Sequence, residues 1–177
     1  DGWSFGAKKS SAGEVVFNTG MVGYTESMTD PSYLGQILVC TFPLIGNYGV
    51  PAKRIDELGL VEGWESERVQ VAGLVVSDYT ALHSHWDAGM SLGAWMDEAG
   101  VPGISGIDTR TLTQRLREHG SMLGHIEVDG GAVEDYDPNP ENLAPRASIT
   151  EAKLYGKATT RIALLDCGAK HNIIRSL

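Results

Sequence analysis

Cysteine is scarce in this chain, which contains only Cys40 and Cys167. Both residues lie in or at the end of apolar, strand-like runs, so we expect no disulfide framework and a reducing, cytoplasmic location. The sequence also has no run that approaches the roughly 18 consecutive apolar residues of a membrane span. Its first residues, DGWS, contain neither the basic run nor the apolar core of a secretory signal. These absences argue against a membrane partner.

Positive charge is also in short supply. Lysine and arginine number 14 against 23 aspartate and glutamate residues, and the formal net charge is −9. Non-specific nucleic-acid binding requires basic patches that neutralise phosphates, so the charge balance argues against that class of function. What the chain does have is an apolar fraction of 42% over 177 residues. This combination is typical of one globular domain, or of one domain and part of another.

Apolar and β-branched runs predict the first half of the fold. Strands are expected at 15–17, 36–42 and 69–77, and the last is apolar enough to be buried on both faces. Residues 1–12 are expected to be irregular, and 43–51 to form a loop because they are rich in proline and glycine.

Two helices are predicted in the middle of the chain. In the first, Ser91 can act as the N-cap, and the apolar side chains that follow recur at helical spacing on one face. The second begins at Asp108 or Thr109, with a brief strand around Ile104 before it and another strand, SMLGHIEV, after it. The residues by themselves therefore support an α/β domain.

The chain changes character after this last strand. Residues 129–147 are acidic and rich in proline, glycine and asparagine, which indicates a loop or linker with room for a short helix. Residues 161–166 are predicted to form a buried strand of the parallel kind, and 171–177 to begin a helix. A strand, a turn and a helix in this order open a doubly wound α/β domain, of which only this first unit is expected here.

No complete set of catalytic residues can be assembled from the sequence. Cys167 lies at the predicted turn between strand and helix, where a nucleophile elbow would place a thiol. A catalytic thiol also needs a base and an oxyanion hole, and the glycines that flank an elbow are replaced here by Leu165 and Ala169. We therefore interpret Cys167 as a small apolar residue at a strand end. A freestanding thiol hydrolase is the alternative, and it requires activity in this chain alone.

Metal and phosphate sites are not indicated either. His83 and His85 have a spacing that can chelate a metal, but no third ligand is evident, so we interpret them as loop histidines beside Trp86. The glycines of IGNYG lack the lysine of a phosphate-binding loop and are more typical of a turn.

Three arginines form a basic helix in this acidic chain. Arg110, Arg115 and Arg117 all lie on the second predicted helix. The simple interpretation is a solvated face, and the sharper one is docking to an acidic surface of a partner. The sequence leaves both interpretations open.

Longer motifs carry a more specific signal. GEVVFNTGMVGYTESMTDPSY, QILVCTFPLIGNYGV and GIDTRTLTQRLREHGSMLG resemble the N-terminal domain of the small, glutamine-using subunit of carbamoyl-phosphate synthase. The last residues, IALLDCGAKHNIIRSL, resemble the start of that subunit's class I glutamine amidotransferase domain. The version fused into the animal multifunctional pyrimidine enzyme is similar too, including SHW at 84–86.

The resemblance implies a domain organisation and a fold. Residues 1–157 would form a swivelling β/β/α-type domain with a mixed sheet, in which the family's first strand is expected to be missing. Residues 158–177 would supply the first strand and part of the first helix of a truncated, doubly wound amidotransferase domain. The family's nucleophilic cysteine, histidine and glutamate lie later, so no catalytic residue, metal ligand or cofactor is expected on this chain.

The resemblance also implies an activity and partners. The parent small subunit would hydrolyse L-glutamine through a thioester, and its ammonia would pass through a tunnel to the large subunit. That subunit would use ATP, metal ions and bicarbonate to make carbamoyl phosphate for arginine and pyrimidine synthesis. This chain would scaffold its own amidotransferase domain and dock the large subunit. A non-catalytic interaction module with no substrate contact is the alternative.

The connection at 20–33, GMVGYTESMTDPSY, is far longer than the roughly two to five residues of a hairpin loop. In the family the TDPSY turn reaches the amidotransferase domain, and the serine that matches Ser32 helps hold the substrate glutamine. Asp30 can bond back onto the turn and Pro31 fixes its backbone, which leaves Ser32 with a hydroxyl that both donates and accepts hydrogen bonds. The alternative is that Ser32 merely closes the turn.

Overall fold

A mixed six-stranded sheet forms the centre of the computed structural model, which describes residues 1–177. The strands follow the order β1-β9-β6-β3-β2-β10, and the inner strands are parallel while the two edge strands are antiparallel to their neighbours. This arrangement confirms the expected α/β class with a mixed sheet. The bounds are Trp3–Gly6 for β1, Ser11–Asn18 for β2, Ile37–Cys40 for β3, Gly73–Val75 for β6, Pro102–Ser105 for β9 and Met122–Ile126 for β10.

The long connection at 20–33 exists because β2 and β3 run parallel, with Val15 beside Ile37. Parallel neighbours need a crossover of about a dozen residues or more, since the chain must return to the end of the sheet from which it started. The crossover contains helix α1, Tyr24–Thr29, and the 3₁₀ turn η1, Pro31–Tyr33. The sequence pattern predicts no helix here, because α1 is short and is held by burial of its tyrosine and methionine rather than by propensity.

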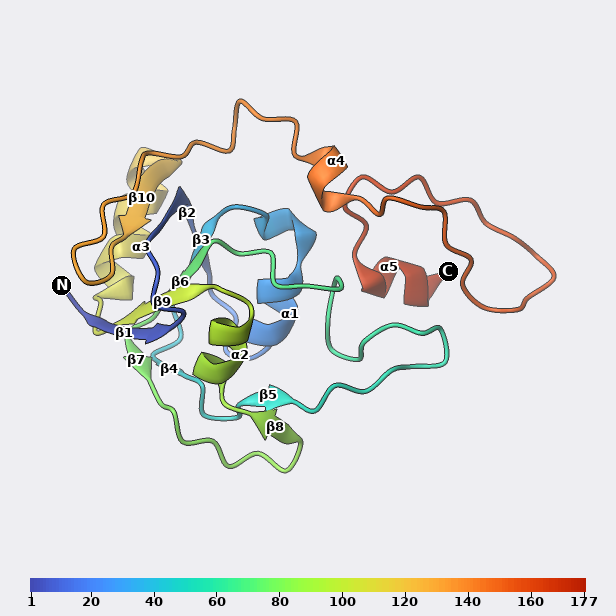
Figure 1. Ribbon diagram of the computed structural model, residues 1–177, viewed down its shortest axis with the longest axis horizontal. Helices are drawn as coiled ribbons and strands as arrows, with labels where there is room; N and C mark the ends of the chain where they lie inside the picture. The colour runs from blue at the N-terminus through green and yellow to red at the C-terminus, as the bar shows by residue number, and fades with distance from the viewer.

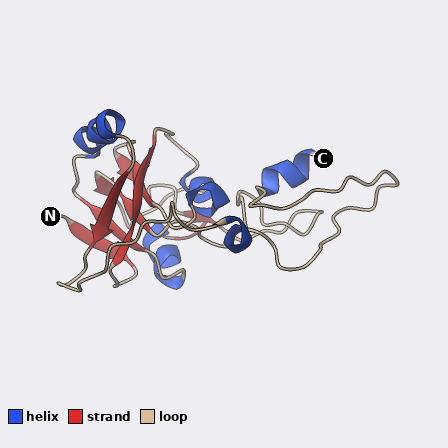
Figure 2. Ribbon diagram, turned by 90° about the horizontal axis from the view of Figure 1, so that it is seen from above, coloured by secondary structure: helices blue, strands red, loops and turns tan.

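Helices cover both faces of the sheet (Figure 2). Helix α3, Thr109–His119, packs on one face, where Leu116 joins Ile37 in an apolar cluster. Helices α1 and α2, Leu92–Glu98, contribute to a larger apolar cluster that includes Leu38. Side chains alternate along a strand, so neighbouring residues of β3 belong to opposite clusters.

The two helices predicted in the middle of the chain are confirmed, and so are their caps. The Ser91 hydroxyl accepts a hydrogen bond from the Ala94 N–H at 3.2 Å, and the Asp108 carboxylate accepts one from the Thr111 N–H at 2.9 Å. Each cap satisfies one of the backbone donors that the first turn of a helix leaves without a partner. None of the helices has the length and apolar character that crossing a lipid bilayer requires.

Two segments that were expected to be irregular contain strands. Residues 1–12 include β1 and the start of β2. Residues 43–51 include β4, Leu44–Ile45, and β5, Val50–Pro51, which pair with β7, Asp78–Tyr79, and β8, Ala88–Met90. The predictions were wrong because each of these strands pairs with a segment far away in the sequence. Local composition does not reveal such a partner.

Beyond β10 the chain has little regular structure. The predicted strand at 161–166 is wrong: these residues form no ladder, and Ile162 and Leu165 are exposed. A strand needs a neighbour for its backbone N–H and C=O groups, and no other strand of the structure pairs with this segment. The final helix is confirmed as α5, His171–Ser176, and a short helix α4, Ala144–Ala147, lies in the linker. Figure 1 shows the chain after β10 passing above the sheet to α4, with α5 and the C-terminus to the right of the sheet.

Candidate functional site

The turn that follows α1 has a fixed backbone and one free hydroxyl. Asp30 is buried, and its carboxylate accepts a hydrogen bond from the Ser32 N–H at 2.9 Å. Pro31 occupies the first position of η1, where its missing N–H has no cost. Ser32 is exposed, and its hydroxyl takes part in none of the hydrogen bonds within the chain. The turn therefore presents a group that can donate and accept hydrogen bonds from a rigid support.

The C-terminal segment, which we define as residues 166–177, contacts this turn through Lys170. The Lys170 ammonium contacts the second oxygen of the Asp30 carboxylate at 2.6 Å, and this hydrogen bond raises the pKa of Lys170. Asp30 therefore holds the backbone of Ser32 with one oxygen and Lys170 with the other. The hydrogen bond from Asp30 back onto the turn is predicted from the sequence and confirmed, whereas the contact with Lys170 is not predicted. The two residues are 140 positions apart, and nothing in the local pattern links them.

The turn at 166–169 approaches the Ser32 turn closely. A Cβ atom on Gly168 would lie 3.4 Å from Pro31 Cβ and 3.1 Å from Ala147 Cβ, and the φ angle of Gly168 is +98°. Burial would raise the pKa of the Asp166 carboxyl, but hydrogen bonds from the backbone N–H groups of Ala169, Ile149 and Gly168 lower it overall. This carboxylate therefore shapes the turn that carries Lys170 toward Asp30.

Helix α5 packs against the acidic loop, which we define as residues 54–67. The Arg175 guanidinium contacts the Asp56 carboxylate at 2.9 Å and donates to the Val61 carbonyl at 2.7 Å. The His171 N–H donates to the Glu65 carbonyl at 2.9 Å. Backbone hydrogen bonds from Leu60, followed by the contact with Arg175, lower the pKa of Asp56.

The acidic loop is connected in turn to α1. The Glu65 N–H donates to the Thr29 hydroxyl at 2.9 Å, and the Ser66 hydroxyl donates to the Thr29 carbonyl at 2.5 Å. Thr29 precedes Asp30, so the acidic loop, the Ser32 turn and the C-terminal segment form one continuous network. Lys153 adds an ion pair with Glu67, which raises the pKa of Lys153.

The structure places the three arginines away from this network. Arg110, Arg115 and Arg117 are exposed on α3, and none of them forms an ion pair. Arg110 and Arg117 are seven residues apart and share one stripe of the helix. Arg115 lies about 140° around the axis from Arg110, because each residue advances an α-helix by about 100°. The three side chains therefore do not point in one direction, and Figure 1 shows α3 on the opposite side of the molecule from α5.

The other residues considered for chemistry are not assembled into a site. Cys167 is exposed and has no hydrogen bond to a histidine. His171 lies buried at the start of α5, and its Nδ1 atom has no hydrogen-bond partner. His83 and His85 are exposed in a loop, and no group of three or more His, Cys, Asp or Glu side chains is placed to hold a metal ion.

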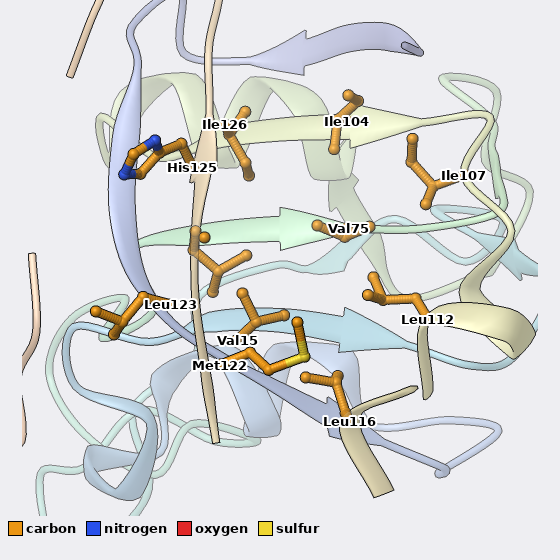
Figure 3. Close-up of a pocket in the computed structure, with 12 residues that line it drawn as sticks. Val15, Val75, Ile104, Ile107, Leu112, Leu116, Met122, Leu123, His125 and Ile126 are labelled. Atoms are coloured by element: carbon orange, nitrogen blue, oxygen red, sulfur yellow. The ribbon is translucent and has the colours of Figure 1, made fainter. Parts of the chain in front are cut away.

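A cavity of about 270 Å³ lies between α3 and the sheet. Ten of its twelve lining residues are hydrophobic, and Figure 3 shows Leu112 and Leu116 of α3 facing Val15 and Val75 of the sheet. His125 lies in its lining and contacts Asp135 at 2.6 Å. The cavity provides apolar volume but no converging polar groups, so it offers no chemistry of its own.

The fold and the site define an α/β domain with a mixed sheet, which presents an exposed hydroxyl on a rigid turn and holds a second segment against that turn through Lys170. Residues 1–126 match the family described as "Carbamoyl-phosphate synthase small chain, CPSase domain". The chain belongs to this family, which confirms the resemblance seen in its motifs.

Relatives match almost the whole chain. "Carbamoyl-phosphate synthase [ammonia], mitochondrial" of Homo sapiens is 50% identical over 99% of this chain and 12% of its own length. "Carbamoyl phosphate synthase arginine-specific small chain" of Saccharomyces cerevisiae is 51% identical over 100% of this chain and 44% of its own length. "Multifunctional protein ura1" of Schizosaccharomyces pombe is 47% identical over 98% of this chain and 9% of its own length. The chain thus spans less than half of each of these relatives.

Proposed function

We propose that this chain is the N-terminal part of a glutamine-dependent carbamoyl-phosphate synthase small chain. In the parent enzyme the small chain hydrolyses glutamine, and its ammonia passes to a large, synthetase part that makes carbamoyl phosphate from bicarbonate and ATP. Residues 158–177 begin the amidotransferase domain in this proposal. The residues described here supply the support for that domain and one contact to the substrate.

The observation that carries the proposal is the free hydroxyl of Ser32 beside the docked C-terminal segment. Free glutamine has an ammonium and a carboxylate at one end, and such a zwitterion needs partners that both donate and accept hydrogen bonds. The Ser32 hydroxyl has this capacity, and Asp30 holds its backbone in place. Lys170, in the segment that begins the amidotransferase domain, contacts the same aspartate. A substrate site between this domain and the Ser32 turn would therefore have the Ser32 hydroxyl at a fixed distance from the amidotransferase domain.

In this proposal the ligands of the synthesis step, ATP and metal ions, belong to the large part. The chain alone is then expected to be inactive. Turnover of glutamine by residues 1–177 that disappears in Cys167→Ala would instead support the freestanding thiol hydrolase.

A second candidate is a parent enzyme that takes free ammonia. The name of the human relative includes ammonia, and that relative is 50% identical to this chain. In such an enzyme the Ser32 turn would be structural, and the domain would be an interaction module without substrate contact. Either parent could serve arginine or pyrimidine synthesis.

The two candidates are separated by assaying the full-length parent enzyme with each nitrogen source. Carbamoyl phosphate formed from glutamine at a rate comparable to that from ammonia supports the proposal. Formation from ammonia alone supports the second candidate, and formation from neither source contradicts both.

A further inference from the structure

The layer between α3 and the sheet lacks side chains at two positions. Side chains alternate along β10, so Met122, Gly124 and Ile126 belong to the face that α3 covers. A Cβ atom on Gly124 would lie 2.6 Å from Val15 Cγ2. On β6, a Cβ atom on Gly73 would lie 2.6 Å from Ile126 Cδ1. Both glycines thus leave room over the sheet, and a cavity of about 270 Å³ lies in this layer.

The lining of this cavity is almost entirely hydrocarbon. Helix α3 contributes Leu112 and Leu116, which are one helical turn apart and therefore lie on the same face of the helix. His125 is the only lining residue with nitrogen or oxygen atoms in its side chain, and its Nε2 atom already contacts Asp135 at 2.6 Å. Figure 3 shows Leu123 and His125 pointing away from the helix side chains. The interior therefore presents aliphatic carbon and one thioether sulfur.

Such a cavity is a poor place for water. An internal water makes about two to four hydrogen bonds, and aliphatic side chains supply none of them. An engineered apolar cavity of about 150 Å³ in another protein stays dry and binds benzene or xenon. The atoms that line an empty cavity also lose dispersion contacts on one side. An apolar molecule would restore those contacts without displacing a favourably bound water.

Size and charge define the class of molecule that fits. The volume lies below the roughly 300–1,000 Å³ of sites for drug-sized ligands, which favours an occupant of one or two rings. The lining contains neither lysine nor arginine, and the exposed Asp135 carboxylate lies beside His125. A fatty acid or another anion would therefore meet like charge and no cation. At the rim, Met122 is 37% exposed and Leu123 is 46% exposed, so the entrance is apolar and, at the methionine, adaptable.

We propose that the cavity between α3 and the sheet binds a neutral, apolar molecule of one or two rings, which enters past Met122. The bound ring would pack between the leucines of α3 and the sheet and stabilise the folded state, because ligands that bind only the folded chain do so. Figure 1 shows α3 on the opposite side of the molecule from α5. The inference concerns a site separate from the Ser32 turn and does not depend on the proposed function.

The test applies a neutral one-ring probe, phenyl(trifluoromethyl)diazirine, to the full-length parent protein. Light releases nitrogen from the probe, the resulting carbene inserts into nearby C–H bonds, and peptide mass spectrometry locates the label. Labelling of Leu112, Leu116 and Met122 should saturate with a Kd of about 1 mM or lower, and toluene should displace it. Labelling there that rises linearly with probe concentration, or that toluene leaves unchanged, would overturn the inference.

The carboxylated form of the same probe tests the class of ligand. It has the same ring and diazirine but carries a negative charge, and burying that charge without a partner is costly. Saturable labelling of the cavity residues by this anion should therefore be weaker by at least about tenfold. Equal or stronger labelling by the anion would contradict the assignment to neutral molecules.

A substitution that fills the cavity provides the matched comparison. Leu112→Trp should weaken saturable labelling by at least about tenfold, because the indole occupies the space that the probe needs. Leu82→Trp is the control, since Leu82 is 85% exposed and does not line the cavity, and it should leave the affinity unchanged. Unchanged affinity in Leu112→Trp with a wild-type circular dichroism spectrum would overturn the inference. If that variant does not fold, the wild-type labelling pattern and its displacement by toluene decide the inference by themselves.

Discussion

Residues 1–126 and 127–177 are held together by different forces. The first region contains the six-stranded sheet and both apolar clusters. In the second region only Pro138 and His171 are buried. The second region is instead attached by ion pairs of Lys153, Lys170 and Arg175 with carboxylates of the first. Salt screens exposed ion pairs but does not screen apolar contacts, so the two regions should respond to different perturbations.

The largest expected effect separates the regions by burial. Leu74→Ala in β6, where the side chain is fully buried, should lower the free energy of unfolding by about 2–5 kcal/mol. Leu165→Ala, with its side chain 87% exposed, should change that free energy by less than about 0.5 kcal/mol. Urea denaturation of a chain of residues 1–177, followed by tryptophan fluorescence, reports on the first region because all four tryptophans of that chain lie within it. Similar midpoints for the two variants would contradict the division.

The second prediction concerns Ser32, which the first region presents to the second. Loss of one hydrogen bond to a charged group costs about 1.5–3 kcal/mol, so Ser32→Ala should raise KM for glutamine by about ten- to a hundredfold in the full-length enzyme. Activity with free ammonia should remain, because that route bypasses the glutamine pocket. The matched control is Ser121→Ala, an exposed serine at the turn between α3 and β10.

Three results of this experiment have different meanings. An unchanged KM would remove Ser32 from the substrate site. An equal loss with ammonia would mean that the turn supports the fold or the contact with the large part. A loss in the control would mean that serine substitutions act through stability.

The third prediction tests the ion pair between the regions. Lys170→Gln should accelerate hydrogen exchange of α5 amides by about two- to fivefold, because a half-exposed ion pair contributes about 0.2–1 kcal/mol. High salt should produce the same change in the wild type and little further change in the variant. Hydrogen exchange of the β3 amides should change neither with Lys170→Gln nor with high salt. Lys157→Gln is the control, since Lys157 is exposed and forms no ion pair. A change of the same size there would show that α5 docking does not depend on the contact with Asp30.

The smallest effect is a pH dependence of α5 docking. Burial lowers the pKa of His171 below its usual value of 6.5, with the nearby positive charge of Arg175 acting in the same direction and Glu67, Glu65 and Asp56 opposing it. The undocked imidazole then binds protons at a higher pH than the docked one. Docking is therefore strongest above pH 6.5 and weakens as the pH falls below that value.

Hydrogen exchange of α5, corrected for the intrinsic effect of pH, should show this dependence between pH 8 and pH 5.5. His171→Asn should flatten the profile, whereas His83→Asn, in an exposed loop, should not. A wild-type profile that is flat, or that shows stronger docking at low pH, would contradict the sign derived for His171.

Much of the sheet and its helices could be predicted from the sequence. Apolar runs located the inner strands, and the caps Ser91 and Asp108 located α2 and α3, because both depend on neighbours within a few residues. Strands β1, β4 and β5 were not predicted, because each is stabilised by pairing with a strand far away in the sequence. The strand predicted at 161–166 had the right composition, but no strand lies beside it.

The sequence by itself determined the family, the class of the sheet and the position of the Ser32 turn. Motif order and local hydrogen bonding, such as that of Asp30 with Ser32, are properties of contiguous residues. Only the tertiary structure decided that Lys170 joins the same carboxylate and that the acidic loop connects Thr29 to α5. These features depend on pairs of residues that are far apart in the sequence and are brought together by chain packing. No single stretch of sequence contains both partners, so local patterns cannot predict these contacts.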